Sequence, residues 1–413
     1  MEIGPIFRAM IQKKVGVILL VAEIAVTMAV VLNCINLVID NRKRLMIPSG
    51  LDEENIFALS IQSYGDGFEE DEFIDQVRQQ DLDLIRAQPG VIDATPIGPL
   101  PLQGGGSSTQ RKVVGAVNDT LVRTPIYRVD EHFLDTLDLA LVEGRAFTNS
   151  DILPRLPDDE QPATPRPLNI IVTKALGDAL FPDGNALGKV ITSSDDSAHN
   201  TIVGIVDYMH TSYDNGASGM EYRIVFFPAR PGSASGMSYL VRAETAAFTD
   251  LFTDLEERLA TLNSDRIIRT RSLLEIKSGS QFVNVFTVRI LSIIGVLLLT
   301  VTALGVYGMT SFTVTERTHQ IGTRRALGAR KFHIVRFFMV ENTIITLFGV
   351  GIGLVMAFGL NAAIVSSASN ASRLPFCLVV LGVAIVWGIG AVSTLLPALR
   401  GASIPPVIAA RSA

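Results

Sequence analysis

The stretch Glu316-Arg-Thr-His-Gln-Ile-Gly-Thr-Arg-Arg-Ala-Leu-Gly-Ala329 lies between two long apolar runs and carries a concentrated positive charge. Residues 311–337 contain six Lys and Arg against one carboxylate, Glu316. A short basic loop between two membrane spans usually faces the cytoplasm. The stretch contains no enzyme signature, and its composition is typical of an element on which another protein docks.

Apolar residues concentrate in four runs that are long enough to cross a membrane. The predicted spans cover residues 15–38, 285–310, 339–364 and 376–396. A helix needs roughly 20 residues to cross the hydrocarbon core. The apolar parts of the last three spans, which in the second begin at Ile290, contain no charged residue except Glu341. Buried helices of soluble proteins rarely stay uncharged on every side, so we predict four transmembrane helices.

The first run has two interpretations. Arg8, Lys13 and Lys14 precede it, as basic residues precede a cleavable signal peptide. However, the run is 24 residues long, and no small-residue cleavage pattern follows it. We therefore expect an uncleaved membrane anchor.

The net charge of −6 hides two oppositely charged parts of the chain. Residues 45–275 hold 18 Lys and Arg against 36 Asp and Glu, a net of −18, whereas the rest holds 17 against 5, a net of +12. An acidic domain outside and basic segments inside follow the positive-inside trend. Arg42, Lys43 and Arg44 run against this trend, and we expect them to contact headgroups at the outer end of the first span.

The expected fold class is a membrane protein with four transmembrane α-helices and a large α+β extracytoplasmic domain inserted between the first and second helices. Two subdomains are expected in that domain. Its predicted strands are residues 56–63, 112–117, 169–173, 201–206, 224–228 and 238–243, and its predicted helices are residues 71–88, 131–137, 174–181 and 247–262. In chain order we predict a cytoplasmic amphipathic helix (1–14), the first span (15–38), the extracytoplasmic domain (45–275), the second span (285–310), a cytoplasmic loop (311–338), the third span (339–364), a short outer loop (365–375), the fourth span (376–396) and a cytoplasmic tail (397–413).

The chain offers little chemistry of its own. Residues 184–190 superficially resemble a phosphate-binding loop, but the spacing is one residue short and Val190 replaces the hydroxyl residue. The five histidines are dispersed, without ligand-like pairing and without a cysteine nearby. We predict no catalytic residue, no metal site, no cofactor on this chain and no nucleic-acid partner.

Two features within the predicted spans carry further expectations. Glu23 lies in the first span, where a carboxylate is by default a functional candidate. Its alternative role is that of a protonated or hydrogen-bonded group that faces the helix bundle. Gly349 and Gly353 give the third span a face of small residues, which we expect to pack against another helix of the same chain.

Within the basic stretch, Ile321, Ala326 and Leu327 are expected to form a small apolar ridge with Arg324 and Arg325 beside it. Gly328 is expected to break the helix. A stub that is apolar on one side and cationic on the other can insert into a groove on a cytosolic partner. The alternative is a solvated loop that only anchors the helices through its positive charge.

The basic stretch resembles the hallmark of the FtsX/MacB-type permease family of ABC transporters, Glu-Arg-x-x-Glu-Ile-Gly-x-Arg-Arg-Ala-Leu-Gly-Ala. Gln320 replaces the second acid of that pattern. The residues in register are Glu316, Arg317, Ile321, Gly322, Arg324, Arg325, Ala326, Leu327, Gly328 and Ala329. The similarity to the MacB-like branch extends to other parts of the chain. In the outer domain it covers residues 129–137, 143–147, 175–189 and 203–206, and in the tail it covers residues 396–400 and 405–409.

This resemblance implies a MacB-like periplasmic core domain joined to an FtsX-like permease in a bacterial inner membrane. It implies that a cytoplasmic ABC ATPase, which binds ATP and Mg, contacts the basic stretch as a coupling helix. The implied contact residues are Glu316, Arg317, Ile321, Gly322, Arg324, Arg325, Ala326, Leu327 and Gly328. Because only 14 residues precede the first span, we expect the ATPase on a separate chain.

The resemblance further implies a dimer with a second copy or a homologous permease, surrounded by membrane lipid. Such permeases transmit force to their periplasmic domains, and the implied function is efflux of peptides, antibiotics or envelope substrates with a periplasmic adaptor. Within the same family, a lipoprotein-releasing permease and an FtsX-like regulator of envelope hydrolases are the alternatives. A membrane-anchored enzyme or sensor has no candidate residues to support it.

Overall fold

The computed structural model divides the chain into two compact units, which we call unit 1 (Met1–Leu45 and Asn284–Ala413) and unit 2 (Met46–Val283). The described residues are 14–64, 68, 71–115, 120–153, 166–211, 219–231, 236–263, 265–367 and 372–404. The amphipathic helix predicted for residues 1–14 therefore lies outside the described residues except for Lys14. The tail beyond residue 404 lies outside them as well.

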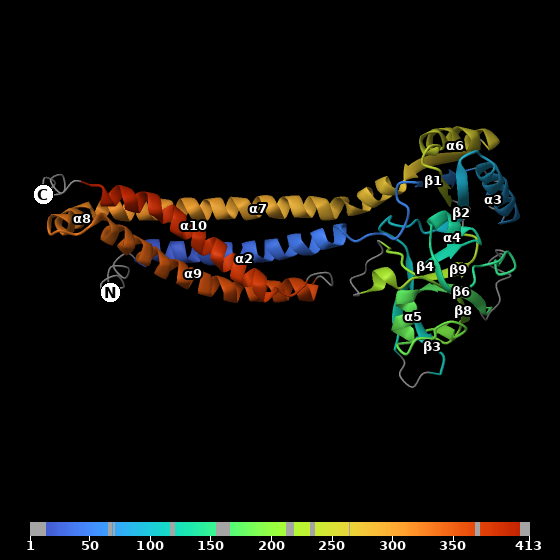
Figure 1. Cartoon of the computed structure of the whole chain (residues 1–413), viewed down its shortest axis with the longest axis horizontal. Coiled ribbons are helices and arrows are strands. Elements are labelled where there is room, and N and C mark those ends of the chain that lie inside the picture. The colour runs from blue at the N-terminus through green and yellow to red at the C-terminus, as the bar shows by residue number, and fades with distance from the viewer. Residues whose placement is uncertain are drawn as a thin grey trace. The chain divides into compact units, whose positions relative to one another are not determined.

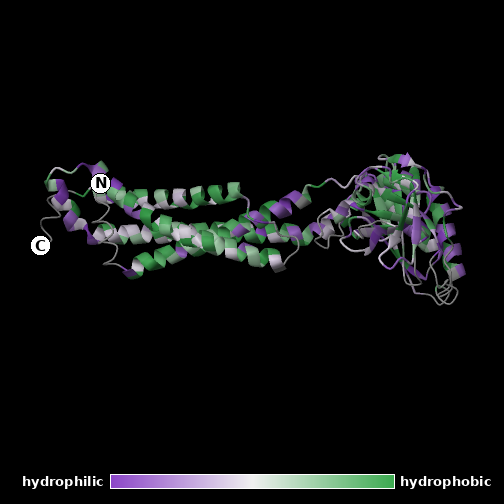
Figure 2. Cartoon of the chain, turned by 90° about the horizontal axis from the view of Figure 1, so that it is seen from below, coloured by the Kyte–Doolittle hydropathy of each residue, from purple (hydrophilic) through white to green (hydrophobic). Residues whose placement is uncertain are grey.

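Unit 1 consists of long helices and one short one (Figure 1). They are α2 (Lys14–Leu45), α7 (Leu273–Glu316, whose first turns belong to unit 2), α8 (Thr318–Ala326), α9 (Lys331–Ser367) and α10 (Phe376–Ala402). Within the described residues, all but α8 are long and apolar enough to cross a membrane. Hydrophobic residues predominate along their length (Figure 2), and a helix satisfies its own backbone hydrogen bonds where no water is present.

Glycines allow α2, α9 and α10 to approach closely. A side chain at Gly353 of α9 would lie 2.7 Å from the Cβ of Met28 on α2, and one at Gly382 of α10 would lie 2.4 Å from Leu32. Gly349 faces α2 in the same way, so the small-residue face packs within one chain as the sequence predicts. Helix α7 is packed less closely, because its most apolar stretch is 17% buried against 44% for α2.

In unit 2, four antiparallel strands form an open sheet in the order β11–β1–β10–β2. These strands are β1 (Ile56–Ser63), β2 (Val91–Gly98), β10 (Met237–Ala243) and β11 (Arg266–Ser272). Alternate residues of β1 point to opposite faces, and both faces are buried. Phe57 and Leu59 pack with helices α3 (Asp71–Arg86) and α6 (Phe248–Leu262), whereas Ile56 and Ala58 join a second apolar cluster.

The other strands of unit 2 close into a ring. The ring order is β4–β3–β7–β8–β6–β9, and β9 returns to β4 through a parallel pairing. Its members are β3 (Ser107–Val113), β4 (Val122–Val129), β6 (Leu168–Thr173), β7 (Val190–Ser193), β8 (His199–Val206) and β9 (Val225–Pro228). Strand β5 (Leu141–Gly144) pairs with β8 beside the ring, and the remaining helices are α4 (Phe133–Leu137), α5 (Lys174–Leu180) and the single turn η2 (Met220–Tyr222). An apolar cluster that includes Ile170, Ile202 and Val225 fills the ring.

One predicted strand is wrong in its bounds, and five strands were not predicted. The strand expected at residues 112–117 is β3, which begins at Ser107 and ends at Val113, because Val114 and Gly115 form a turn in which Gly115 has φ +74°. Strands β2 and β4 each contain a proline, β5 and β7 have four residues each, and β11 carries three arginines. These features lower the strand signal of a sequence, and charges on β11 protect an edge of the sheet from further pairing.

A buried ion pair fixes α3 to the open sheet. Both nitrogens at the end of the Arg266 side chain donate to the carboxylate of Asp81, at 2.6 and 2.8 Å, and the Tyr239 hydroxyl donates to it at 3.0 Å. Neither charged side chain is exposed. Burial raises the pKa of Asp81, while Arg266 and Tyr239 oppose that rise, so the pair offsets only part of the cost of desolvation.

We predict that Asp81→Asn lowers the free energy of unfolding of unit 2 by about 3–5 kcal/mol, because it leaves the Arg266 charge buried without a counter-charge. Hydrogen exchange of the β1 and β10 amides in the full chain measures this loss. The control is Asp254→Asn, since Asp254 is exposed and lies 4.0 Å from Arg258, and it should cost less than about 1 kcal/mol. Equal exchange in the two variants would contradict the prediction.

Candidate functional site

The basic stretch forms a short helix with a defined end. Helix α7 ends at Glu316, Arg317 breaks the helical path, and α8 follows from Thr318 to Ala326. The Gly328 amide donates to the Arg325 carbonyl and the Ala329 amide to the Arg324 carbonyl, both at 3.0 Å. This is a Schellman motif, which requires a left-handed residue after the helix, and Gly328 has φ +95°. The glycine therefore ends the helix, as the sequence predicts.

Helix α8 is held against the helix bundle by its buried face. Ile321 is 5% exposed, and Gly322 is buried beside it. The cluster around Ile321 comes from α7, α9 and α10 and consists of Val314, Ile334, Phe338, Ala398 and Ala402. Leu327, in contrast, is 84% exposed. The expected ridge of Ile321, Ala326 and Leu327 is therefore wrong, because Ile321 points into the bundle and the other two point away from it.

An ion pair connects the start of α8 to α9. Each terminal nitrogen of Arg317 donates to one carboxylate oxygen of Glu341, and both distances are 3.2 Å. Both side chains are largely buried, at 13% and 12% exposure. The Arg317 and Arg324 guanidiniums also lie over the ring of Phe337, at 5.6 and 5.4 Å from its centre. A charge-assisted, two-pronged contact of this kind fixes orientation as well as position.

The end of α8 is tied to α10. Arg325 donates to the carbonyl oxygen of Ile404, just beyond α10, at 2.6 Å. The stretch thus divides into residues that hold α8 (Arg317, Ile321, Gly322 and Arg325) and residues that are exposed to solvent (Glu316, Arg324, Ala326, Leu327 and Gly328). Phe332, at the start of α9, is 69% exposed beside them.

Sequence reasoning missed two participants in this site. Glu341 was recognised only as the single charge in the apolar parts of the last three spans, and Phe337 was not singled out. The signal for Glu341 was available, because a carboxylate at the edge of a membrane span needs a cation nearby. Arg317 lies 24 residues away in the chain, so the pairing itself could not be inferred from spacing.

Glu23 faces helix α7 inside unit 1. A side chain at Gly305 of α7 would lie 2.5 Å from the Glu23 carboxylate, so the glycine leaves the space that Glu23 occupies. Oxygen Oε1 of Glu23 is buried without a hydrogen-bond partner. One turn further along α2, the hydroxyls of Thr27 and Thr302 are hydrogen bonded at 2.7 Å. The structure therefore places Glu23 toward the bundle and brings no second charged group to it within the described residues.

The described residues give no sign of a metal or nucleotide site. No group of three His, Cys, Asp or Glu within them is arranged to hold a metal ion. Residues 184–190 lead into strand β7, whereas a phosphate-binding loop leads into a helix. A cavity of about 40 Å³ lies between α8 and α9, beside Gln320 and Phe337. Its volume is close to that of one water molecule.

Two family models together match most of the chain. The model described as MacB-like periplasmic core domain matches residues 17–280, and the model described as FtsX-like permease C-terminal matches residues 292–406. The second match contains the whole of α8 and its contacts on α9 and α10.

Individual relatives have low sequence identity to this chain, but the matches cover most of its length. The macrolide export ATP-binding/permease protein MacB of Neisseria meningitidis serogroup A is 27% identical over 344 residues, which are 79% of this chain and 48% of that protein. The uncharacterized ABC transporter permease YknZ of Bacillus subtilis is 23% identical over 74% of each chain. The periplasmic region of MacB from Actinobacillus actinomycetemcomitans aligns with a TM-score of 0.36 and 18% identity, over 55% of this chain and 93% of that one. This chain spans about half the length of the MacB relatives that it matches.

We predict that Gly328→Ala loosens the end of α8, because an alanine in the left-handed conformation costs roughly 1–2 kcal/mol. No neighbouring atom lies within 4 Å of the new methyl group, so the effect comes from the backbone alone. Hydrogen exchange of the amides at residues 327–329 measures the change. Gly279→Ala is the matched control, since Gly279 lies within helix α7 and also has no neighbour within 4 Å. Unchanged exchange at residues 327–329 would contradict the assigned cap.

Proposed function

The chain belongs to the MacB- and FtsX-type permeases of ABC transporters, and we propose that it carries ATP-driven motion from a cytoplasmic ATPase to its own extracytoplasmic domain. Its four apolar helices and the match to a periplasmic core domain make it a membrane protein with an extracytoplasmic domain. Unit 2 lies before α7 in the chain and α8 lies after it. One crossing by α7 therefore puts α8 on the cytoplasmic side.

The observation that carries this proposal is the continuity of α7. Its 44 residues form one unbroken helix, which corresponds to about 66 Å. Leu273 and Ile276 in its first turn are fully buried in the apolar core of unit 2. Only Arg317 separates its last residue, Glu316, from α8. A stiff helix that is embedded at one end and joined to α8 at the other transfers displacement between the two.

A cluster of polar contacts at the base of unit 2 reinforces the embedded end. Lys277 of α7 forms an ion pair with Glu53 at 2.6 Å, and Ser49 donates to the same carboxylate at 2.5 Å. Ser49 lies in the segment that leaves α2, where its carbonyl oxygen accepts the His210 amide at 2.9 Å. Glu53 therefore ties the chain that enters unit 2 from α2 to the chain that leaves it through α7. We call these residues the base clamp.

The exposed part of the α8 stretch is the proposed input surface. Leu327 and Phe332 offer apolar side chains, and Arg324 and Lys331 surround them with positive charge. A surface with exposed apolar side chains and neighbouring cationic side chains suits a groove on a cytosolic protein. The partner that we propose is an ABC ATPase subunit, which holds the nucleotide and its Mg.

The exposed face of α7 supports a second proposed contact. Ile293, Val296 and Leu304 are each 65% exposed in the single chain, although they lie in the apolar part of the helix. We propose that a second copy of the chain, or a similar permease, packs on this face. Two copies would give two α8 surfaces for two ATPase subunits.

The proposed output is export on the extracytoplasmic side. A relative that matches 79% of this chain is named a macrolide export ATP-binding/permease protein, which supports export as the class of activity. Apart from Glu341, which is paired with Arg317, Glu23 is the one charged side chain within the described apolar stretches that faces the bundle, whereas an ion or solute route through the bundle needs more polar groups. Cargo such as peptides, antibiotics or envelope substrates would therefore be moved by unit 2, with a periplasmic adaptor as its receiver.

We predict that Leu327→Asp reduces the amount of ATPase retained with the tagged chain about tenfold or more, because a charge replaces an exposed apolar contact at the centre of the input surface. The measurement is affinity purification in mild detergent with identification of retained proteins by mass spectrometry. Leu262→Asp is the matched control, since Leu262 is an exposed leucine of unit 2. Undiminished retention in Leu327→Asp would favour the solvated-loop interpretation.

We predict that Lys277→Met uncouples unit 2 from α7 without changing ATP turnover by the complex, because it removes the ion pair of the base clamp. Spin labels on unit 1 and unit 2 report the distance change on addition of ATP, and that change should shrink in the variant. Lys174→Met, at an exposed lysine on α5, should leave it unaltered. A full distance change in Lys277→Met would show that the clamp is not required.

A further inference from the structure

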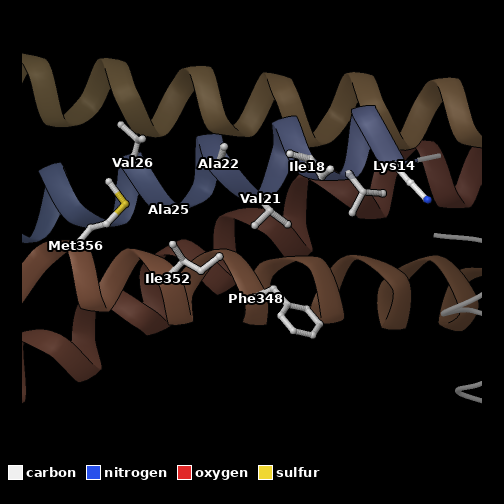
Figure 3. Close-up of a pocket in the computed structure, with 10 residues that line it drawn as sticks. Lys14, Ile18, Val21, Ala22, Ala25, Val26, Phe348, Ile352 and Met356 are labelled. Carbon is white, nitrogen blue, oxygen red and sulfur yellow. The ribbon is translucent and has the colours of Figure 1, made fainter. Parts of the chain in front are cut away.

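An apolar groove of about 680 Å³ runs between α2 and α9 in unit 1. Its lining residues are Lys14, Val17, Ile18, Val21, Ala22, Ala25, Val26, Phe348, Ile352 and Met356. Figure 3 shows Phe348, Ile352 and Met356 in a row along α9, with Ile352 and Met356 extending toward α2. Several of these side chains are about half exposed, with Ile18 at 63% and Phe348 at 51%. Lys14 is the single polar residue of the lining, and it lies at one end.

The groove has the length of one membrane leaflet. From Lys14 to Val26 the α2 helix rises about 18 Å. Half of a typical hydrocarbon core is about 15 Å. Lys14 marks the cytoplasmic end, because α2 continues from it toward unit 2, which is extracytoplasmic. In agreement, Gly16 packs against Met309 of α7, near the end of α7 that leads into α8. The groove thus opens at the inner surface with a cation and closes near the middle of the bilayer.

The charge at the inner surface decides between two occupants. A second copy of this chain would bring its own basic stretch to the same level of the membrane, where residues 311–337 hold six Lys and Arg against Glu316 alone. The other carboxylate at this end of the described helices, Glu341, is already paired with Arg317. The basic stretch of a second copy would therefore repel the Lys14 ammonium group, whereas an anionic lipid headgroup would provide a counter-charge to it. Basic pockets between transmembrane helices on the cytoplasmic side suit such headgroups.

We propose that this groove binds an anionic phospholipid of the inner leaflet, with one acyl chain along the α2–α9 groove and the phosphate beside Lys14. The apolar lining contacts the acyl chain and contributes most of the contact area. The Lys14 side chain places its apolar stem along the groove and its ammonium group at the headgroup level. Apolar contact holds any lipid, so the preference for an anionic one comes from Lys14.

The test is native mass spectrometry of the full chain, delipidated and then incubated with phosphatidylglycerol or phosphatidylcholine. The wild-type chain should retain phosphatidylglycerol in preference to phosphatidylcholine. Lys14→Gln should reduce the phosphatidylglycerol adduct about fivefold, which is the contribution of one lysine near a charged surface. Lys43→Gln is the matched control, because Lys43 is an exposed lysine at the opposite end of α2. It should leave the adduct unchanged.

A second variant tests the groove itself. Ala22→Trp fills it from an exposed position on α2 and should lower the adducts of both lipids. Equal retention of the two lipids by the wild-type chain, or an unaltered adduct in Lys14→Gln, would overturn the proposal. A loss of dimer mass in Ala22→Trp with no loss of lipid would overturn it as well, and would assign the groove to a second copy. No ATPase is present in these measurements, so their outcome is independent of the proposed function.

Discussion

The hydrocarbon interior of a membrane offers no water to backbone groups, so the chain can cross it only as helices. Helix α7 meets this constraint with one unbroken helix from Leu273 to Glu316, and its two ends serve different structures. At its start, side chains are buried in the core of unit 2, and at its end the chain turns directly into α8. In the proposed function, a displacement of α8 along the helix axis would reach the base of unit 2, because a helix cannot shorten without losing backbone hydrogen bonds.

The position of α8 depends on a charge that the membrane would otherwise exclude. Glu341 lies on α9 among apolar residues, where an unpaired carboxylate is costly. Arg317 provides the counter-charge through two hydrogen bonds, and the ring of Phe337 lies under the guanidiniums of Arg317 and Arg324. Ile321 adds apolar contact with α9 and α10. With these contacts the bundle holds one side of α8, while Leu327 remains exposed on the other.

The elements that the sequence predicted are those with strong local signals. The four apolar helices follow from composition alone, and the end of α8 follows from Gly328. Strands β2 and β11 escaped prediction, because Pro96 and the arginines of β11 oppose the local pattern and only neighbouring strands stabilise them. The Asp81–Arg266 ion pair could not be predicted either, because its partners lie 185 residues apart in the chain. In the site, burial of Ile321 could not be foreseen, because its periodicity fits either face of so short a helix.

The packing of unit 1 indicates where motion is easiest. Glycines bring α2, α9 and α10 into close contact, so a shift among them would create steric overlap. Between α2 and α7, Gly16 also lies close to Met309, Glu23 faces Gly305 without a hydrogen bond from Oε1, and Thr27 and Thr302 form a buried hydrogen bond. Such a bond contributes only about 1 kcal/mol net. We infer that α7 moves against a stiff core of three helices, because its most apolar stretch is 17% buried in the single chain, less than that of α2, α9 or α10.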